Sequence, residues 1–282
     1  MSNRPRPPAG AFLRQLRQRS AARLAGHDLA LLTAALTFYA AIAVLPLLII
    51  AVAGASALVG DERVRALGSS LAALAPSELG FAEGVRALVR TGSEVRLVAL
   101  AAALIPATTY GEGLVRAFAR LADADTPRKS LRGRVLSVAL LAVLPLLVLL
   151  GLGAVAALPS LLTGSTVASG AGFWGAYASF LVTWAASTAL LAVTYRTFTP
   201  VRLRPAAVAW AAAATGSFLA GMSLGWVVVL RFGVQVGQAY GGSEAIGSAV
   251  LFVVYLYLVQ LTCVLGYVLA MALTDVLADR RR

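Results

Sequence analysis

The sequence has little charge and few of the residues that most enzymes use. Only 13% of its 282 residues are charged, about half the share of an average soluble domain. A single cysteine and a single histidine exclude an internal disulfide and a multi-histidine metal site. The sequence also lacks a Gly-x-x-x-x-Gly-Lys-Ser/Thr phosphate loop, so no ATP hydrolysis through such a loop is expected. We therefore expect no metal ion and no cofactor.

Apolar residues, in contrast, are abundant. They make up 60% of the chain, and the mean hydropathy is +0.84. A soluble protein of this length could not bury so much apolar side chain. The composition therefore predicts an all-α, polytopic membrane protein and excludes a soluble enzyme, a disordered tail protein and a disulfide scaffold.

Six apolar runs predict six transmembrane helices, because about 20 mostly apolar residues cross the hydrocarbon core of a bilayer. The second run is the weakest, since it reaches spanning length only by including Glu112 and Arg116. Pro46 and Pro145 predict kinks in the first and third spans. The predicted spans cover residues 29–59, 97–118, 135–158, 173–195, 205–230 and 245–273.

Basic residues are distributed unequally between alternate segments. The N-terminal segment, two loops and the C-terminal tail together hold 18 basic residues, whereas the other three loops hold 6. By the positive-inside rule, both termini face the cytoplasm of a bacterial plasma membrane. The predicted organisation is a basic juxtamembrane segment at 1–28, one six-helix domain at 29–274 with an outer amphipathic loop at 60–96, and a short cytoplasmic tail at 275–282.

Short amphipathic helices are predicted at both membrane interfaces. Phe12, Leu13 and Leu16 are interspersed with arginines, which favours an interfacial helix on anionic head groups of the cytoplasmic leaflet. Helical spacing recurs in the outer loop at residues 64–74 and 81–89. The expected partner is therefore the lipid bilayer. The N-terminal arginines lack interleaved aromatic residues, so no nucleic acid is expected, and the oligomeric state stays open.

Aromatic, proline and glycine residues recur near the ends of the predicted spans, at Phe38, Tyr39, Pro46, Tyr195, Pro200, Tyr240, Gly241 and Gly266. Their order resembles the YihY/BrkB family of bacterial inner-membrane proteins, once labelled ribonuclease BN. That family has a Phe-Tyr-Ala-x-x-Ser-x-x-Pro motif, a Tyr-Arg-x-x-Pro type of turn, a Tyr-Gly pair and a late Gly-Ala-Glu-Leu element. The resemblance covers about residues 10–275.

The resemblance implies a six-helix plasma-membrane protein associated with envelope integrity, for which transport or export roles have been proposed. It implies no settled substrate. Two positions depart from the family pattern: Ala43 stands in place of a serine and Val268 in place of a glutamate. Any substrate chemistry that those polar groups perform in relatives is lost or moved in this chain.

Charged residues within the second span are the leading candidates for a substrate path. Glu112 and Arg116 are four residues apart, so they share a helix face, and Arg120 extends that face. Ionisable residues inside a membrane mark functional sites by default. The alternative is a snorkelling pair at the interface. Thr108 and Tyr110, which follow Pro106, could line an opened cavity or belong to an ordinary kink.

Other polar and small residues have structural interpretations that we favour. Thr33 and Thr37 are expected to bond their own helix carbonyls, and Asp28, next to His27, to cap the first span. Gly221 and Gly225 predict close helix packing, inside the bundle rather than between protomers. The loop containing Gly237 and Gln238 is expected to be a tight turn, Glu244 to favour the start of the sixth span, and Cys263 to lie in the core.

The leading hypothesis is a transporter or exporter of an amphiphilic or anionic envelope component, such as a lipid. The alternative is a scaffold that positions envelope-assembly partners without transporting anything. We expect no enzyme activity. A metal-dependent nuclease needs clustered carboxylates or histidines, and besides Asp28 the predicted cytoplasmic segments offer one histidine and few acidic residues, at Glu112, Asp123, Asp125, Asp275 and Asp279.

Overall fold

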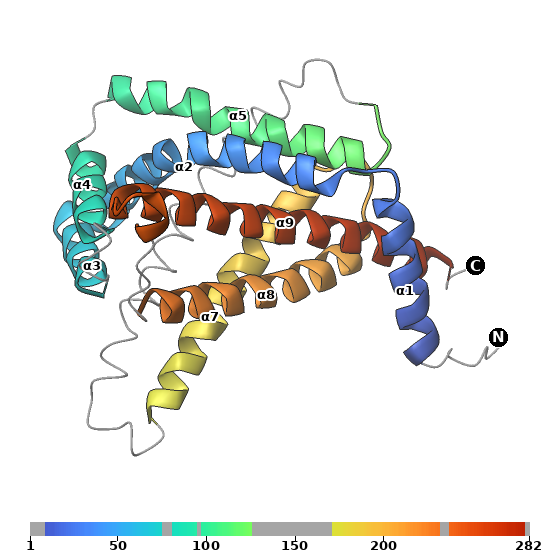
Figure 1. Cartoon of the computed structure of the whole chain (residues 1–282). Helices are drawn as coiled ribbons and strands as arrows, with labels where there is room; N and C mark the ends of the chain where they lie inside the picture. The colour runs from blue at the N-terminus through green and yellow to red at the C-terminus, as the bar shows by residue number, and fades with distance from the viewer. Residues whose placement is uncertain (1–8, 75–80, 95–96, 126–170, 232–236, 280–282) are drawn as a thin grey trace.

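The computed structural model of the chain describes residues 9–74, 81–94, 97–125, 171–231 and 237–279 (Figure 1). Every regular element within these ranges is helical, as the composition predicts, and no strand occurs among them. The elements are α1 Ala9–Leu24, α2 Leu29–Val59, α3 Asp61–Leu74, α4 Phe81–Glu94, α5 Leu97–Leu121, α7 Ala171–Thr197, α8 Pro205–Arg231, the 3-10 turn η3 Gln238–Tyr240 and α9 Glu244–Asp279.

The long helix α9 is the centre of the bundle. It packs against α1, α2 and α8, and it also touches α5 and α7. The helix α2 packs against α5, and α7 packs against α8. Figure 1 shows α2, α5, α8 and α9 running along one common direction, with α7 crossing α8. The α2 helix continues without interruption through Pro46, and α5 through Pro106.

Three of the described helices are long and apolar enough to cross a membrane: α2, the 205–226 part of α8, and α9. At most 39% of the residues in the most apolar window of each are buried inside the protein. Large apolar side chains such as Phe38, Trp210 and Phe252 are exposed, as expected for surfaces that face lipid. The expected membrane protein is confirmed at this level. The number of six spans stays a prediction, and the predicted span 135–158 lies outside the described residues.

Three aromatic rings, two of them stacked, join the helices at one end of the bundle. The rings of Phe118 on α5 and Tyr267 on α9 are parallel to within 7°, with centroids 4.0 Å apart. Tyr195 on α7 lies 6.1 Å from each of them. All three side chains are fully buried. They form the centre of the main hydrophobic core, which packs α5, α7, α8 and α9 together.

The absence of a side chain at Gly266 allows α7, α8 and α9 to meet. A Cβ atom at this position would lie 2.2 Å from the Tyr195 hydroxyl oxygen and 2.3 Å from Thr215 Oγ1. Any side chain here would therefore push the helices apart. The Tyr195 hydroxyl donates a hydrogen bond of 2.9 Å to the carbonyl of Cys263, and Cys263 is buried in the core, as predicted.

The helices α3 and α4 lie together at the opposite end of the bundle from α1 (Figure 1). Both pack against α2, where Val64 and Val89 join Val52 and Ala55 in a small second core. The two short amphipathic helices expected in the outer loop are therefore present. Their location on the outer face of the membrane stays a prediction.

The helix α1 lies across the end of the bundle where α9 finishes (Figure 1). Its Arg19 and Arg23 form ion pairs with Asp279 and Asp275 of α9, the second at 3.1 Å. Its apolar residues Phe12, Leu16 and Leu24 pack against the main core. The sequence predicted that this apolar face contacts lipid, but Phe12, Leu16 and Leu24 cover protein instead. Leu13, on the same helix, is largely exposed.

Candidate functional site

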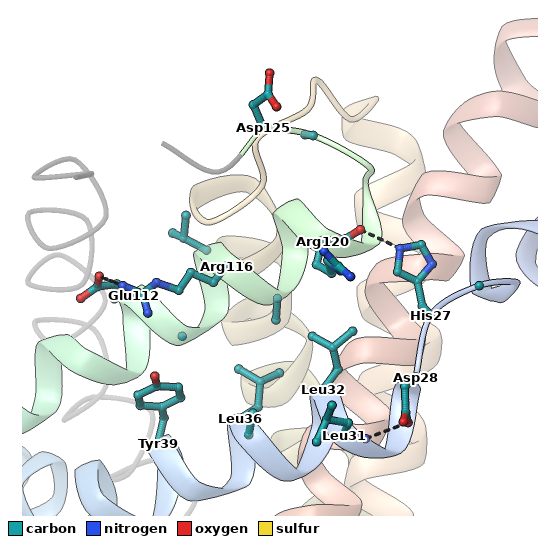
Figure 2. A pocket seen from close by; sticks show the side chains of 16 residues that line it. His27, Asp28, Leu31, Leu32, Leu36, Tyr39, Glu112, Arg116, Arg120 and Asp125 are labelled. Carbon is teal, nitrogen blue, oxygen red and sulfur yellow. Dashed lines mark hydrogen bonds and ion pairs between the residues drawn. The ribbon is translucent and has the colours of Figure 1, made fainter. Parts of the chain in front are cut away.

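A groove of about 850 Å³ lies between the first half of α2 and the second half of α5. Figure 2 shows charged side chains from α5 and from the loop before α2 around an apolar floor on α2. The groove's lining residues come from the start of α2 and the last turns of α5, at the end of the bundle where α1 lies and α9 finishes (Figure 1). Its described lining residues are Gly26, His27, Asp28, Leu31, Leu32, Ala35, Leu36, Tyr39, Glu112, Gly113, Val115, Arg116, Ala117, Arg120, Ala124 and Asp125.

Local packing at both ends of the floor determines the groove's shape. At one end, Gly113 of α5 lies against the ring of Tyr39, where an added Cβ would meet Tyr39 Cδ2 at 2.8 Å. At the other end, Asp28 caps α2 as predicted, because its Oδ1 accepts a 3.0 Å hydrogen bond from the Leu31 amide. The α2 and α5 helices thus approach closely near Gly113, and the groove follows the line between them toward Asp28.

Glu112 and Arg116 form the ion pair that their spacing predicts. Arg116 donates a hydrogen bond of 2.5 Å to Glu112 Oε1. The pair is not buried in the protein: 61% of the Arg116 side chain and 37% of the Glu112 side chain are exposed. This geometry fits a pair at the rim of the groove better than one deep in a closed path. The third predicted residue, Arg120, is exposed and lies one turn further along the same face.

His27 is a groove residue whose position the sequence did not reveal. Its Nε2 lies 2.8 Å from the carbonyl oxygen of Arg120 and 3.5 Å from Asp123 Oδ1. A carbonyl can only accept, so Nε2 carries the proton that is donated to Arg120. The His27 side chain is 9% exposed, and its Nδ1 has no hydrogen-bond partner among the described residues. The ring thereby attaches the start of α2 to the end of α5.

Thr108 and Tyr110 lie apart from the groove. The Thr108 hydroxyl donates to the carbonyl of Ile105 at 2.8 Å, within its own helix. The Tyr110 hydroxyl forms reciprocal hydrogen bonds of 3.1 and 3.0 Å with the amide of Gln260 on α9. Neither residue belongs to the groove lining. Of the five proposed path residues, the structure brings together Glu112, Arg116 and Arg120.

The threonines of α2 and the glycines of α8 do not line the groove. Thr37 donates to the carbonyl of Thr33 at 2.8 Å, as expected for a helix-internal bond. Thr33 itself is buried, and its hydroxyl has no hydrogen-bond partner among the described residues. A Cβ at Gly221 or Gly225 would meet no described atom within 4 Å. The close internal packing predicted there is therefore absent from the described part of the chain.

The residues that carried the family resemblance divide into two groups. Tyr39, Tyr195 and Gly266 hold helices together through the contacts described above. Pro46 lies within α2, and Phe38, Pro200 and Tyr240 are exposed. The two positions that depart from the family pattern, Ala43 and Val268, are buried and apolar.

The loop between α8 and α9 forms a compact turn where the structure describes it. Tyr240 ends η3, and Gly241 follows it in the left-handed backbone region. The Gly237 amide donates to Glu244 Oε2 at 3.3 Å, so Glu244 links the start of α9 to the turn before it. The first part of this loop, residues 232–236, lies outside the described residues. The described part fits the predicted tight turn.

A comparison with protein-family models decides the family. The model described as virulence factor BrkB matches residues 20–282, nearly the whole chain. The chain belongs to the BrkB family. This confirms the family resemblance that the order of the motifs indicated, and it agrees with the exposed apolar surfaces of α2, α8 and α9. Neither curated proteins nor solved structures yielded a match.

In this BrkB-family protein, the groove between α2 and α5 combines charged and apolar groups around a hollow. No group of three or more His, Cys, Asp or Glu residues that could hold a metal ion occurs in the described ranges. The expectation that the chain needs no metal stays a prediction. The groove is suited to bind a ligand that has both charged and apolar parts, because it places guanidinium and carboxylate groups beside an apolar wall.

Proposed function

We propose that this BrkB-family protein transports an amphiphilic or anionic component of the envelope, such as a lipid, along the groove between α2 and α5. The observation that supports the proposal is the groove's mixed lining. Arg116 and Arg120 lie on the α5 side, and Leu31, Leu32 and Leu36 form the floor on α2. Guanidinium groups recognise phosphate oxygens, and the leucines suit an acyl chain.

An exposed apolar stripe on α2 connects the groove to the rest of the helix surface. Leu31, Phe38, Ile42 and Leu45 are all exposed, and their spacing places them on one helix face together with Ala35. Leu31 and Ala35 belong to the groove, whereas the other three continue along the helix toward its far end. A lipid tail could therefore stay in contact with hydrocarbon while its head group lies in the groove.

The charged end of the bundle supports a cytoplasmic location for the groove. Arg19 and Arg23 of α1 and Arg204 before α8 contact the last turns of α9. Arg116 and Arg120 lie in the last two turns of α5, which ends on the same side of the bundle (Figure 1). Both described ends of the chain lie on this side, joined by the Arg23–Asp275 ion pair. The positive-inside rule then gives a multi-pass plasma-membrane protein that receives its substrate from the inner leaflet.

Flux through purified protein in proteoliposomes tests the proposal. A tail-labelled phospholipid and a water-soluble anion of similar head-group chemistry are compared, each with and without an imposed proton or sodium gradient. We expect the lipid to cross faster than in protein-free liposomes, and the soluble anion to stay behind. If neither crosses although the protein is folded, the scaffold alternative replaces transport.

A further inference from the structure

The rim of the groove holds more negative than positive groups. The lining holds two guanidinium groups, Arg116 and Arg120, and three carboxylates, Asp28, Glu112 and Asp125, of which Figure 2 shows Asp125 pointing away from the two arginines. The arginines are neighbours on one helix, which is why the sequence favoured an anionic ligand. The fold adds Asp28 from the loop before α2 and Asp125 from the chain after α5. A head group in the groove therefore meets carboxylates as well as guanidinium groups, which disfavours a purely anionic one.

The two arginines differ in how far they are already engaged. Arg116 is paired with Glu112 at 2.5 Å. The exposed guanidinium of Arg120 has no ion-pair partner among the described residues. Figure 2 shows Arg120 between the Glu112–Arg116 pair and Asp28. Arg120 is therefore the better phosphate ligand of the two, since its planar fork can bind two oxygens at once.

Asp28 retains capacity to accept a further hydrogen bond. Its Oδ1 accepts from the Leu31 amide, and its second carboxylate oxygen has no hydrogen-bond partner among the described residues. The side chain is exposed at the end of the apolar floor. A carboxylate in this position can bind a positively charged amine that is covalently attached to the phosphate held by Arg120.

We propose that the groove selects a zwitterionic lipid whose phosphate ester carries a primary ammonium group. Arg120 binds the phosphate, the carboxylate of Asp28 binds the ammonium, and the tails follow Leu31 and Ala35 onto the exposed stripe of α2. This inference rests on the proposed function and names the head group that the same site recognises. The occupant is a lipid rather than a free phosphoamine, because the floor of the groove is apolar.

Binding of short-chain lipids to the purified full chain in detergent tests the head group. Dioctanoyl phosphatidylethanolamine and dioctanoyl phosphatidylglycerol are titrated separately, with native mass spectrometry as the readout. We expect the ethanolamine lipid to bind about fivefold tighter, the size that one partly exposed ion pair contributes. Arg120→Gln should weaken the binding of both lipids.

The variant Asp28→Asn isolates the ammonium contact. Asparagine caps helices as well as aspartate does, so α2 keeps its N-terminus, and a thermal unfolding curve checks this. We expect the preference for the ethanolamine lipid to disappear. The matched control is Asp61→Asn, which removes the same charge at the first turn of α3, at the other end of the bundle. Asp61→Asn should show the same preference for the ethanolamine lipid as the wild-type chain.

The outcomes separate the two proposals. Equal affinity for both lipids in the wild-type chain, or an unchanged preference in Asp28→Asn, overturns the head-group assignment and leaves lipid transport standing. Binding of neither lipid overturns both proposals. Competition by phosphoethanolamine without tails that is as strong as competition by the intact lipid overturns the choice of a lipid as the occupant.

Discussion

Tyr195 and Gly266 are in direct contact across the α7–α9 interface: a Cβ on Gly266 would lie 2.2 Å from the Tyr195 hydroxyl oxygen. The same hydroxyl donates to the carbonyl of Cys263, one turn earlier on α9. Tyr195 therefore binds the α9 backbone where Gly266 leaves room for it. This contact lies beside the stacked rings of Phe118 and Tyr267, so it contributes to the core that also positions α5.

The first prediction concerns this contact. Gly266→Ala should destabilise the protein by about 1–3 kcal/mol, because it overpacks a core with no space for a methyl group. Thermal unfolding in detergent measures the effect. The control is Gly84→Ala on α4, where no described atom lies within 4 Å and the unfolding temperature should stay unchanged or rise slightly. An equal loss in both variants would contradict the close contact.

The second prediction uses Tyr195→Phe as a partner for that substitution. Alone, it removes the hydrogen bond to Cys263, which should cost about 0.5–1.5 kcal/mol. It also removes one of the two oxygen atoms that a methyl group on Gly266 would meet. In a double-mutant cycle, Gly266→Ala should therefore cost less in the Tyr195→Phe background than in the wild-type chain. Strict additivity would show that the two residues do not touch.

The third prediction concerns the ion pair at the groove rim. Because Arg116 and Glu112 are 61% and 37% exposed, their coupling free energy should be about 0–1 kcal/mol. A cycle of Glu112→Gln, Arg116→Gln and the double variant, followed by thermal unfolding, measures it. A coupling of about 3–5 kcal/mol would instead indicate a pair that the surrounding membrane and chain bury completely.

The fourth prediction concerns the attachment of α1. The ion pairs Arg19–Asp279 and Arg23–Asp275 hold this helix across the end of α9. Neutralising both aspartates with asparagine should increase the rate at which trypsin cleaves α1, and high salt should do the same to the wild-type chain by screening the pairs. Asp61→Asn serves as the control and should leave cleavage unchanged. An unchanged rate in the double variant would mean that apolar contacts alone hold α1.

The fifth prediction concerns topology. Reporter fusions after Arg134 and Arg204 should indicate the cytoplasm, and fusions near Gly80, Gly164 and Gly237 should indicate the outside, by the positive-inside rule. Reporter activity in intact cells measures this. A C-terminal fusion that reports outside would contradict the predicted even number of spans.

The helices were predictable because local chemistry determines them. The uncharged run 29–59 and the start at Pro205 coincide with the bounds of α2 and α8. The helix α9 extends to Asp279, beyond the predicted end at 273, since Asp275 and Asp279 pair with arginines of α1. That pairing joins residues about 250 positions apart, and no local pattern in the sequence reveals it.

The groove was predictable only in part, for the same reason. The four-residue spacing of Glu112 and Arg116 predicts their ion pair, because helix geometry alone brings them together. The positions of His27, Asp28 and Asp125 depend on how α2 meets α5. In the sequence His27 is only the neighbour of Asp28, whereas in the fold its Nε2 donates to the carbonyl of Arg120.

The measurement that tests the central claim most directly is lipid flux through a chain whose groove has been filled. Ala35 is exposed and lines the groove, whereas the adjacent Ala34 is exposed and lies outside it. Proteoliposomes with Ala35→Trp should lose most of the flux of labelled phospholipid, and Ala34→Trp should retain it, with both variants unfolding at the wild-type temperature. Equal flux through the two folded variants would contradict transport along the groove between α2 and α5.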